Sequence, residues 1–424
     1  MAIDDQIEIF PSGPLNASVR PPGSKSITNR AVICAAFGSG ESVLEGALDS
    51  DDTRVMLESL QRLGIAVELS GSTLRVSGGE PRPAGLVELF VGNSGTTMRF
   101  LGAMLATCHG RFRLDGVPRM RERPIGDLLD TLEQLGVSAG SERSNRCPPV
   151  LIDANGLAGG RAEVRGDISS QFLSGLLMAC PRARRQVTLC VNGELVSQPY
   201  VEMTLGVMRA FGAEVEATGL REFRIPGGQR YQARHYAVEP DASAASYFWA
   251  AAAIAGGSVT VEGLTSDSLQ GDVRFVDCLR QMGCEIRTGN AAITVVGRPL
   301  RGIDVDMNAI SDTVQTLVAV ALFADGPTTI RGVAHIRHKE TDRIGDLARE
   351  VRKLGATVDE LPDGLRIQPG PLRGAVIDTY QDHRMAMSLS LPGLRTPGVV
   401  IRDPACTAKT YPGFFRDLRK LTTP

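Results

Sequence analysis

The stretch DTRVMLESLQRLGIAVEL, residues 52–69, joins a helical pattern to a strand pattern at one glycine. Its apolar residues first recur every three or four positions, as on one face of an amphipathic helix, and then alternate with polar ones, as in a half-buried strand. The glycine between the two patterns, Gly64, stands where a helix C-cap needs a left-handed backbone. The stretch therefore predicts a helix that ends at a glycine and is followed by a strand.

The same pattern returns four more times, in IGDLLDTLEQLGVSAG (125–140), VEMTLGVMRAFGAEVEA (201–217), DVRFVDCLRQMGCEIRT (272–288) and IGDLAREVRKLGATVDE (344–360). The terminal glycines are 72, 76, 71 and 72 residues apart, and YPGFFRDLRKL (411–421) supplies a helical pattern near the end of a sixth unit. Units of roughly 70 residues are too long for solenoid repeats and too short for robust domains. We therefore predict two similar α/β domains of three units each.

Two segments rich in proline and glycine are candidates for crossings between these domains, VRPPGS (19–24) and IPGGQRYQARHYAVEP (225–240). If the chain crosses at both, its first strand belongs with the C-terminal half. The predicted domains are residues 1–20 plus 237–424 and residues 21–236.

The composition is typical of an ordinary soluble globular protein, with 424 residues, 42% apolar residues and a net charge of −2. This charge gives no reason to expect nucleic acid or an anionic membrane as a partner. The eight cysteines form no C-x-x-C pair, so we expect free thiols in a reducing compartment. Because the N-terminus lacks the features of a signal or transit peptide and the apolar runs are too short for a membrane span, the predicted location is the cytoplasm.

Cations and small polar residues gather where helices are predicted to begin. GSKSITNRAVICAAF (23–37), GNSGTTMRF (92–100) and GDISSQFLSGLLMAC (166–180) place them before apolar helices, whose free N–H groups favour an anion. Further charged segments are PRMRERPIGDLLDTL (118–132), HIRHKETDRIGDL (335–347), DHRMAM (382–387) and CTAKTYPGFF (406–415). Each segment alone fits a capped helix with solvated charges. Together they form a set of helix-entry cations in both halves of the chain, with carboxylates among them.

In order and spacing, these segments, with SQPYVEMT (197–204), QGDVRF (270–275) and KETDRI (339–344), resemble the 5-enolpyruvylshikimate-3-phosphate synthases from end to end of the chain. The resemblance implies two domains, each of three βαβαββ-type units in an inside-out α/β barrel, which close on an active site in the interdomain cleft. The implied reaction transfers the enolpyruvyl group of phosphoenolpyruvate to the 5-hydroxyl of shikimate 3-phosphate by addition and elimination. It releases phosphate and belongs to the shikimate pathway of aromatic amino acid biosynthesis.

The resemblance also implies a role for individual residues. Those expected around phosphoenolpyruvate are Lys25, Gly95, Arg123, Gln171, Arg343, Arg384 and Lys409. Those expected around shikimate 3-phosphate are Lys25, Ser26, Arg30, Ser169, Ser170, Gln171, Ser197, Tyr200, Asp312 and Lys339. Expected to transfer protons are Asp312, Glu340 and Lys25, and further candidates for substrate contact are His335 and Asn93. No metal or organic cofactor is implied, and we expect a monomer whose partners are these small molecules.

The chain departs from the family at a few positions. The family often has Asn where this chain has His335, and many members carry Ala and Pro where it has Thr97 and Phe100. The herbicide glyphosate occupies the phosphoenolpyruvate site of the family, so the retained Gly95 predicts sensitivity to it.

Two other functions are weighed against this one. The sister enzyme that transfers enolpyruvyl to UDP-N-acetylglucosamine typically uses a cysteine on a mobile loop as its acid, whereas Cys108 and Cys147 lie outside the motifs here. A non-catalytic anion-binding relative would be expected to have lost some of the residues Lys25, Asp312, Glu340 and Lys409, and all are present. Both observations favour the shikimate reaction.

Overall fold

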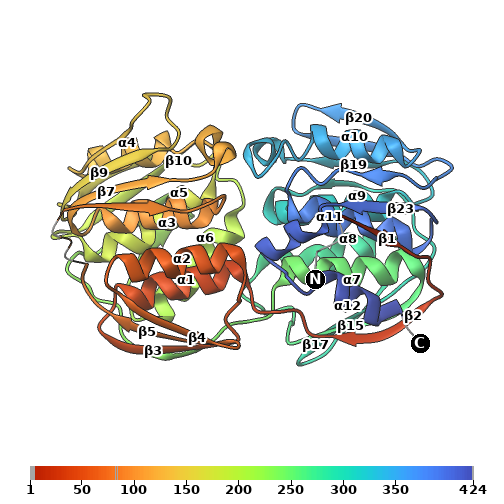
Figure 1. The fold of residues 1–424 in the computed structure, drawn as a ribbon, viewed down its shortest axis with the longest axis horizontal. Coiled ribbons are helices and arrows are strands. Elements are labelled where there is room, and N and C mark those ends of the chain that lie inside the picture. The colour runs from red at the N-terminus through yellow and green to blue at the C-terminus, as the bar shows by residue number, and fades with distance from the viewer. Residues whose placement is uncertain (1–4, 82, 84, 423–424) are drawn as a thin grey trace. The chain divides into compact units, whose positions relative to one another are not determined.

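The computed structural model describes residues 5–81, 83 and 85–422, and Figure 1 labels its elements. The chain forms two compact units: unit 1 comprises Met1–Pro22 and Glu239–Pro424, and unit 2 comprises Gly23–Val238. Each boundary lies two residues after the predicted one. Pro22 stays with unit 1 because its carbonyl accepts a hydrogen bond from Asp241 N (2.8 Å), and Val238 stays with unit 2 because its N–H donates to Glu45 O (2.8 Å).

One succession of elements repeats within each unit, and residues 86–155 give it in full. Strand β6 (Leu86–Phe90) leads through helix α3 (Gly95–Leu105) to the parallel strand β7 (His109–Asp115). Helix α4 (Gly126–Gln134) then leads to β8 (Ser138–Ser141) and β9 (Val150–Asn155), and β9 pairs antiparallel with both β7 and β8. The resulting sheet has the order β6-β7-β9-β8 and the βαβαββ connectivity that the resemblance implied.

Unit 2 contains two further modules of this kind. One consists of β10 (Gly160–Arg165), α5 (Ser170–Ala179), β11 (Val187–Asn192), α6 (Gln198–Ala210), β12 (Glu216–Thr218) and β13 (Glu222–Ile225). The other consists of α1 (Lys25–Ala36), β3 (Gly40–Glu45), α2 (Asp51–Arg62), β4 (Ala66–Ser70) and β5 (Thr73–Gly78). Its first strand is β14 (His235–Ala237), which pairs parallel with β3. The last strand of unit 2 therefore fills the place of a strand before α1.

Unit 1 repeats the same plan. Its first module consists of β2 (Leu15–Val19), α7 (Ala242–Ala255), β15 (Gly257–Glu262), α8 (Phe275–Gln281), β16 (Glu285–Thr288) and β17 (Ala292–Val296). Its second consists of β18 (Asp304–Asp306), α9 (Val314–Ala321), β19 (Thr328–Arg331), α10 (Gly345–Lys353), β20 (Thr357–Leu361) and β21 (Gly364–Gln368). Since β2 pairs parallel with β15, the N-terminal part of the chain belongs with the C-terminal half, as predicted.

The third module of unit 1 ends differently. It consists of β22 (Val376–Ile377), α11 (His383–Ser390), β23 (Val399–Arg402) and α12 (Phe414–Thr422), and α12 is the helix predicted from residues 411–421. In place of a hairpin, the N-terminal strand β1 (Gln6–Ile9) pairs antiparallel with β23. Its sheet therefore has three strands, β1-β23-β22, where the other modules have four.

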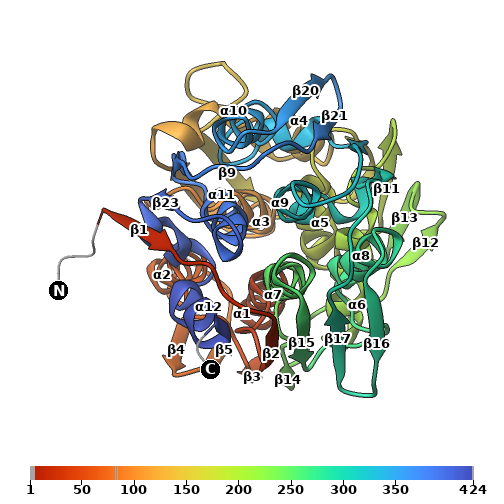
Figure 2. The same cartoon turned by 90° about the vertical axis from the view of Figure 1, so that its right-hand side faces the viewer.

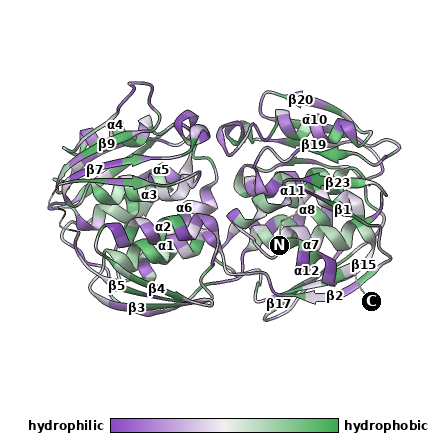
Figure 3. Cartoon of the chain, in the orientation of Figure 1, coloured by the Kyte–Doolittle hydropathy of each residue, from purple (hydrophilic) through white to green (hydrophobic). Residues whose placement is uncertain are grey.

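The helices fall into two classes by burial. Every residue of α3, α9 and α11 is buried, and α1, α5 and α7 are buried along most of their length. The alternate helices are amphipathic, and they pack between neighbouring sheets: α2 contacts β4 and β6, and α4 contacts β8 and β10. Figure 2 shows the inner helices α7, α9 and α11 of unit 1 surrounded by its sheets, and in Figure 3 the outer helix α10 carries both hydrophilic and hydrophobic colours.

The five glycines of the repeat follow five outer helices, and each has a positive φ. The angles are 82° at Gly64, 85° at Gly136, 83° at Gly212, 115° at Gly283 and 105° at Gly355. Residues with a side chain rarely adopt such angles, so glycine ends each helix at low cost. The predicted helix, glycine and strand are therefore confirmed in all five places. Within the described ranges, no helix is long and apolar enough to cross a membrane.

Candidate active site

The inner helices begin at the segments where cations and small polar residues gather. In unit 2, α1 begins at Lys25, α3 at Gly95 and α5 at Ser170; in unit 1, α9 follows Asp312 and α11 begins beside Arg384. The predicted residues therefore form two groups, one in each unit. The unit 2 cluster is Lys25, Ser26, Arg30, Asn93, Gly95, Arg123, Ser169, Ser170, Gln171, Ser197 and Tyr200. The unit 1 cluster is Asp312, His335, Lys339, Glu340, Arg343, Arg384 and Lys409.

The inner helices of unit 2 are capped by serines. The hydroxyl oxygens of Ser24, Ser94 and Ser169 accept hydrogen bonds from Ile27 N (3.3 Å), Thr97 N (3.4 Å) and Gln171 N (3.3 Å). A hydroxyl satisfies one free N–H group but brings no negative charge to the positive end of the helix dipole. These helix starts therefore remain suited to an anion from outside the chain.

Arg99, which sequence reasoning named only as an added charge of GNSGTTMRF and did not assign to the site, joins three of the segments in unit 2. Its Nη1 donates to Gln171 Oε1 (2.9 Å) and to Gly95 O (3.4 Å), and its Nη2 donates to Pro124 O (3.1 Å). The starts of α3 and α5 and the chain before α4 are therefore held by one guanidinium. The available signal was its position in GNSGTTMRF, four residues after Gly95 and thus on the same face of α3.

Gly95 leaves room for two guanidinium groups. A Cβ at this position would lie 2.5 Å from Arg123 Nη2 and 2.5 Å from Arg99 Nη1. Arg123 is 4% exposed, and its Nη1 donates to Asn93 O (3.1 Å) and Asn93 Oδ1 (3.2 Å). The structure thus brings together four of the predicted residues, Asn93, Gly95, Arg123 and Gln171.

Arg30 is turned into the interior of unit 2. Its Nε donates to Thr204 Oγ1 (2.7 Å), its Nη1 to Ser26 O (2.9 Å) and its Nη2 to Tyr200 O (3.2 Å). Its guanidinium lies 5.0 Å from the centroid of the Phe100 ring. Phe100, one of the departures from the family, thus packs against the predicted site residue Arg30. Burial lowers the pKa of Arg30 to about 10, which leaves it charged at neutral pH. Arg30 therefore ties the start of α1 to the start of α6.

The remaining members of the unit 2 cluster lie at separate helix starts. Lys25 Nζ is 3.2 Å from Asp52 Oδ2, a buried carboxylate in the first turn of α2. Ser170 opens α5, and Ser197 precedes α6 with a φ of 54°, in the left-handed region that serine rarely adopts. Such backbone strain is commonly found where function requires a side chain in one place.

Arg343 is the centre of the unit 1 cluster and is 1% exposed. Its Nε and Nη2 donate to the two oxygens of Asp382 (2.7 and 3.1 Å), and its Nη2 lies 2.8 Å from Glu340 Oε2. Its Nη1 donates to Asp312 Oδ1 (3.4 Å). Burial acts to lower the pKa of Arg343, but the three carboxylates outweigh it and raise that pKa above its ordinary value.

The two predicted proton-transfer carboxylates have different surroundings. Asp312 meets three cations: Lys339 Nζ at 3.0 Å, Arg343 Nη1 at 3.4 Å and Arg384 Nη2 at 2.8 Å. Glu340 meets Arg343 and also Lys409, whose Nζ is 3.9 Å from Glu340 Oε1. Burial lowers the pKa of Lys339, and the charge of Asp312 opposes this.

Asp382 is a second residue that sequence reasoning missed. Its side chain is fully buried, and besides holding Arg343 it caps α11 by accepting a hydrogen bond from Arg384 N (2.9 Å). One carboxylate thus orients two predicted ligands of phosphoenolpyruvate. An Asp directly before the apolar helix of DHRMAM is a strong N-cap signal, but the pairing with Arg343 depends on a contact distant in sequence.

His335 is a neutral group among these charges. Its Nε2 lies 3.0 Å from Ser311 Oγ, and the ring is 8% exposed. Burial, assisted by the charge of Lys339, lowers the pKa of His335 to about 3. The imidazole is therefore uncharged at neutral pH and contributes hydrogen bonding beside Asp312.

The cysteines of this chain are poorly suited to thiol chemistry. The eight cysteines are free, and burial raises their pKa values, to about 12 for Cys34 and Cys278 and about 11 for Cys108. They are therefore poor sources of a thiolate. In residues 5–81, 83 and 85–422, no three His, Cys, Asp or Glu side chains are grouped as metal ligands.

Comparison with known proteins places this geometry in a known context. Residues 9–418 match the profile of the family described as EPSP synthase (3-phosphoshikimate 1-carboxyvinyltransferase). A curated 3-phosphoshikimate 1-carboxyvinyltransferase of Nostoc punctiforme is 50% identical over 95% of each chain. That of a Marinomonas strain is 48% identical over 97% of this chain and 98% of its own. That of Salmonella heidelberg is 45% identical over 99% of this chain and 100% of its own. The solved EPSP synthase of Acinetobacter baumannii superposes with a TM-score of 0.83, 26% identity and 98% coverage of both chains.

Proposed function

Because the chain belongs to the EPSP synthase family, we propose that the unit 1 and unit 2 clusters carry out that family's reaction. The chain is an enzyme that transfers the enolpyruvyl group of phosphoenolpyruvate to the 5-hydroxyl of shikimate 3-phosphate and releases phosphate. The observation that carries the assignment of residues is the buried guanidinium of Arg343, which contacts both Asp312 and Glu340.

The substrates bring two phosphates and two carboxylates, and the two clusters offer complementary ways to receive them. We assign shikimate 3-phosphate to neutral donors at or near helix starts, namely Ser26, Ser169, Ser170, Ser197 and Tyr200, and to one cation, Lys339, with Lys25 and Gln171 near both substrates. We assign phosphoenolpyruvate to Arg123, Arg343, Arg384, Lys409 and the backbone at Gly95. Forked guanidinium groups suit planar carboxylates and phosphates, and they offset the cost of removing such anions from water.

Arg30 receives a modified role in this proposal. Its donors are engaged with Thr204, Ser26 and Tyr200 inside unit 2, so it acts on shikimate 3-phosphate through the residues that it positions.

The contacts of the two carboxylates suggest a division of the proton transfers. Asp312 contacts Lys339, a proposed ligand of shikimate 3-phosphate, so we assign it as the base that takes the proton of the 5-hydroxyl as its oxygen bonds to C2 of phosphoenolpyruvate. Glu340 contacts Arg343 and Lys409, proposed ligands of phosphoenolpyruvate. We therefore assign it as the acid that donates a proton to C3 in the addition. In the elimination, C3 returns its proton to Glu340, the double bond re-forms, and the C2–O bond to phosphate breaks.

Lys25 is the third proposed participant. Its ammonium lies against Asp52 at 3.2 Å and can donate a proton or a hydrogen bond to the departing phosphate. We also keep the predictions of a monomer, a cytoplasmic location and a reaction without metal or organic cofactor.

A phosphate-release assay with two acceptors tests the function. With phosphoenolpyruvate present, we expect release with shikimate 3-phosphate and none with UDP-N-acetylglucosamine. Release with only the second acceptor would assign the chain to the sister reaction, and binding of both substrates without release would favour a non-catalytic relative.

A further inference from the structure

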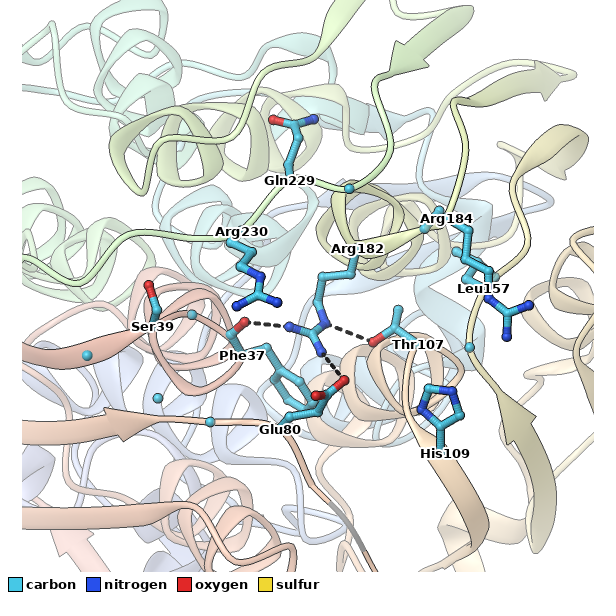
Figure 4. Close-up of a pocket in the computed structure, with 17 residues that line it drawn as sticks. Phe37, Ser39, Glu80, Thr107, His109, Leu157, Arg182, Arg184, Gln229 and Arg230 are labelled. Carbon is cyan, nitrogen blue, oxygen red and sulfur yellow. Dashed lines mark hydrogen bonds and ion pairs between the residues drawn. The ribbon is translucent and has the colours of Figure 1, made fainter.

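Unit 2 has a polar cavity at the opposite ends of the helices that carry its cluster. The cavity has a volume of about 490 Å³ and is lined by residues at the C-terminal ends of α1, α3 and α5 (Figure 4). At 1.5 Å per residue, these helices separate the cavity from the helix starts by about 15 Å. A ligand held here therefore makes no contact with the unit 2 cluster, and the volume suits a small organic molecule.

The cavity is a product of the threefold repeat. Each module lines it with the turn after its inner helix, which gives residues 37–40, Thr107 with His109, and 182–184. Each module also lines it with the turn after its last strand, which gives residues 78–80, 156–157 and 228–230. Since the three modules contribute equivalent backbone turns, the chemistry of the cavity depends on the side chains in which these turns differ.

Arg182 has a structural task at this place. Its Nη1 donates to Phe37 O (2.8 Å), its Nε donates to Thr107 Oγ1 (3.1 Å), and its Nη2 lies 3.6 Å from Glu80 Oε1. A cation is favoured at the carbonyl ends of helices, so these contacts explain its presence without a ligand.

Arg184 and Arg230 are less engaged with the surrounding chain than Arg182 is. Both are exposed and line the same cavity, and Arg184 uses Nη2 to donate to Asn155 O. Figure 4 shows the guanidinium groups of Arg182 and Arg230 and the ring of His109 around the hollow. Three arginines and one glutamate line this cavity, an excess of two positive charges in a chain whose net charge is −2. Like charges gathered in a concave site attract an anion.

Comparison with the equivalent cavity of unit 1 distinguishes Arg182, which has a counterpart there, from the additional arginines of unit 2. A cavity at the ends of α7 and α9 is lined by Arg298, Asp325 and Arg395, and the guanidinium of Arg395 lies 5.4 Å from the centroid of the Phe323 ring. Arg182 lies over Phe37 in the same manner, at 5.5 Å. An arginine over a phenylalanine is therefore common to both units, whereas the greater positive charge belongs to unit 2.

We propose that this cavity is a second anion-binding site, for phosphate or a small phosphate ester attracted by Arg184 and Arg230. Two guanidinium groups can each give paired hydrogen bonds to a phosphate, and the excess of two charges matches a dianion.

Titration calorimetry on the full chain tests the site, with inorganic phosphate and glycerol 3-phosphate as separate probes. The variant is R184A/R230A, and the matched control is R143A/R221A, which removes two exposed arginines elsewhere in unit 2. We expect the wild type and the control to bind at the cavity in addition to the helix starts. In R184A/R230A we expect the affinity of the cavity site to fall by more than about tenfold, since charged hydrogen bonds are lost.

The variant should keep its enzymatic activity within about twofold, because its helix starts are unchanged. Tighter binding of glycerol 3-phosphate than of phosphate would identify an ester as the ligand, and equal binding would identify the free ion. Identical isotherms for the wild type and R184A/R230A would overturn the proposal, and so would an equal loss in both double variants, which would indicate unspecific attraction.

Discussion

The two units build the starts of their inner helices from the same backbone plan but with different caps. Unit 2 uses Ser24, Ser94 and Ser169, whereas unit 1 uses Asp241 before α7 and Asp382 before α11, with Asp312 just before α9. A serine leaves the helix start open to an external anion, while an aspartate supplies the anion from the chain itself.

This difference separates two tasks. In unit 1 the carboxylates hold arginines and lysines in a largely buried network, which we propose accepts and returns protons. In unit 2, we propose that hydroxyl, amide and cationic groups receive the anionic groups of the ligand. The comparison teaches that one repeated backbone plan can present helix starts of different charge by the choice of the capping residue.

The largest test of this division replaces the proposed proton carrier. Glu340→Gln keeps the shape of the side chain but cannot take a proton, so we expect kcat to fall by about a hundredfold to ten thousandfold. The matched change in unit 2 is Gln171→Ala, which removes the acceptor of Arg99 Nη1 and should raise KM for phosphoenolpyruvate more than it lowers kcat. Steady-state phosphate release measures both. If Gln171→Ala reduced kcat as strongly as Glu340→Gln, the proposed division of tasks would fail.

The caps themselves provide the second test. Asp382→Ala leaves the buried Arg343 without its two-oxygen partner, and we expect it to lower the free energy of unfolding by about 3 kcal/mol. Ser94→Ala removes only a neutral cap and should cost about 1 kcal/mol. Urea unfolding of the two variants measures the contrast. Equal losses would mean that the charge of the unit 1 cap has no special weight.

The sequence predicted the outer helices better than the inner ones. The outer helices are amphipathic and end at glycines such as Gly64 and Gly355, so their period can be read from one chain. The inner helices are buried on all sides, and their uniform apolar character hides their period. The site lies at their starts, and most of its residues were therefore assigned by resemblance and not by pattern.

The missed residues share a physical cause. Arg99 and Asp382 hold other side chains in place, through contacts with Gln171 and Arg343 that lie 72 and 39 residues away. Similarly, the N-terminal strand was predicted to join the C-terminal half, but the complementary pairing of β14 with β3 was not foreseen. Contacts of this kind arise from the three-dimensional packing of modules, which local patterns do not encode.

The third test concerns space in unit 2. In Gly95→Ala, the new Cβ would lie 2.5 Å from Arg99 Nη1 and from Arg123 Nη2, so at least one guanidinium must move. We expect KM for phosphoenolpyruvate to rise by about a hundredfold, the equivalent of one charged hydrogen bond, with a smaller change in kcat. The matched control is Gly102→Ala on the same helix, because a Cβ on Gly102 would meet only Leu128 Cδ2, at 3.6 Å.

The Gly95→Ala variant also addresses glyphosate. The wild type should be inhibited in competition with phosphoenolpyruvate, and Gly95→Ala should weaken this inhibition together with substrate binding. Thr97 and Phe100 are engaged with the Ser94 hydroxyl (2.8 Å) and the Arg30 guanidinium, respectively, so we expect them to leave the inhibition intact. No competition at millimolar glyphosate in the wild type would refute the prediction.

The smallest effect concerns His335, the neutral exception among the charges of unit 1. Its pKa is lowered by burial to about 3 in the folded chain, against an ordinary value of 6.5, so between these values the unfolded chain binds a proton that the folded chain does not. The resulting stability is complete above about pH 6.5 and is lost as the pH falls. At pH 5.5 the loss should be about 1.4 kcal/mol relative to neutral pH, and His335→Asn should abolish it.

Urea unfolding of wild type, His335→Asn and the exposed control His109→Asn at the two pH values measures this difference. An equal acid loss in all three proteins would mean that the buried imidazole does not discriminate between its charge states, and that unit 1 tolerates another cation beside Asp312.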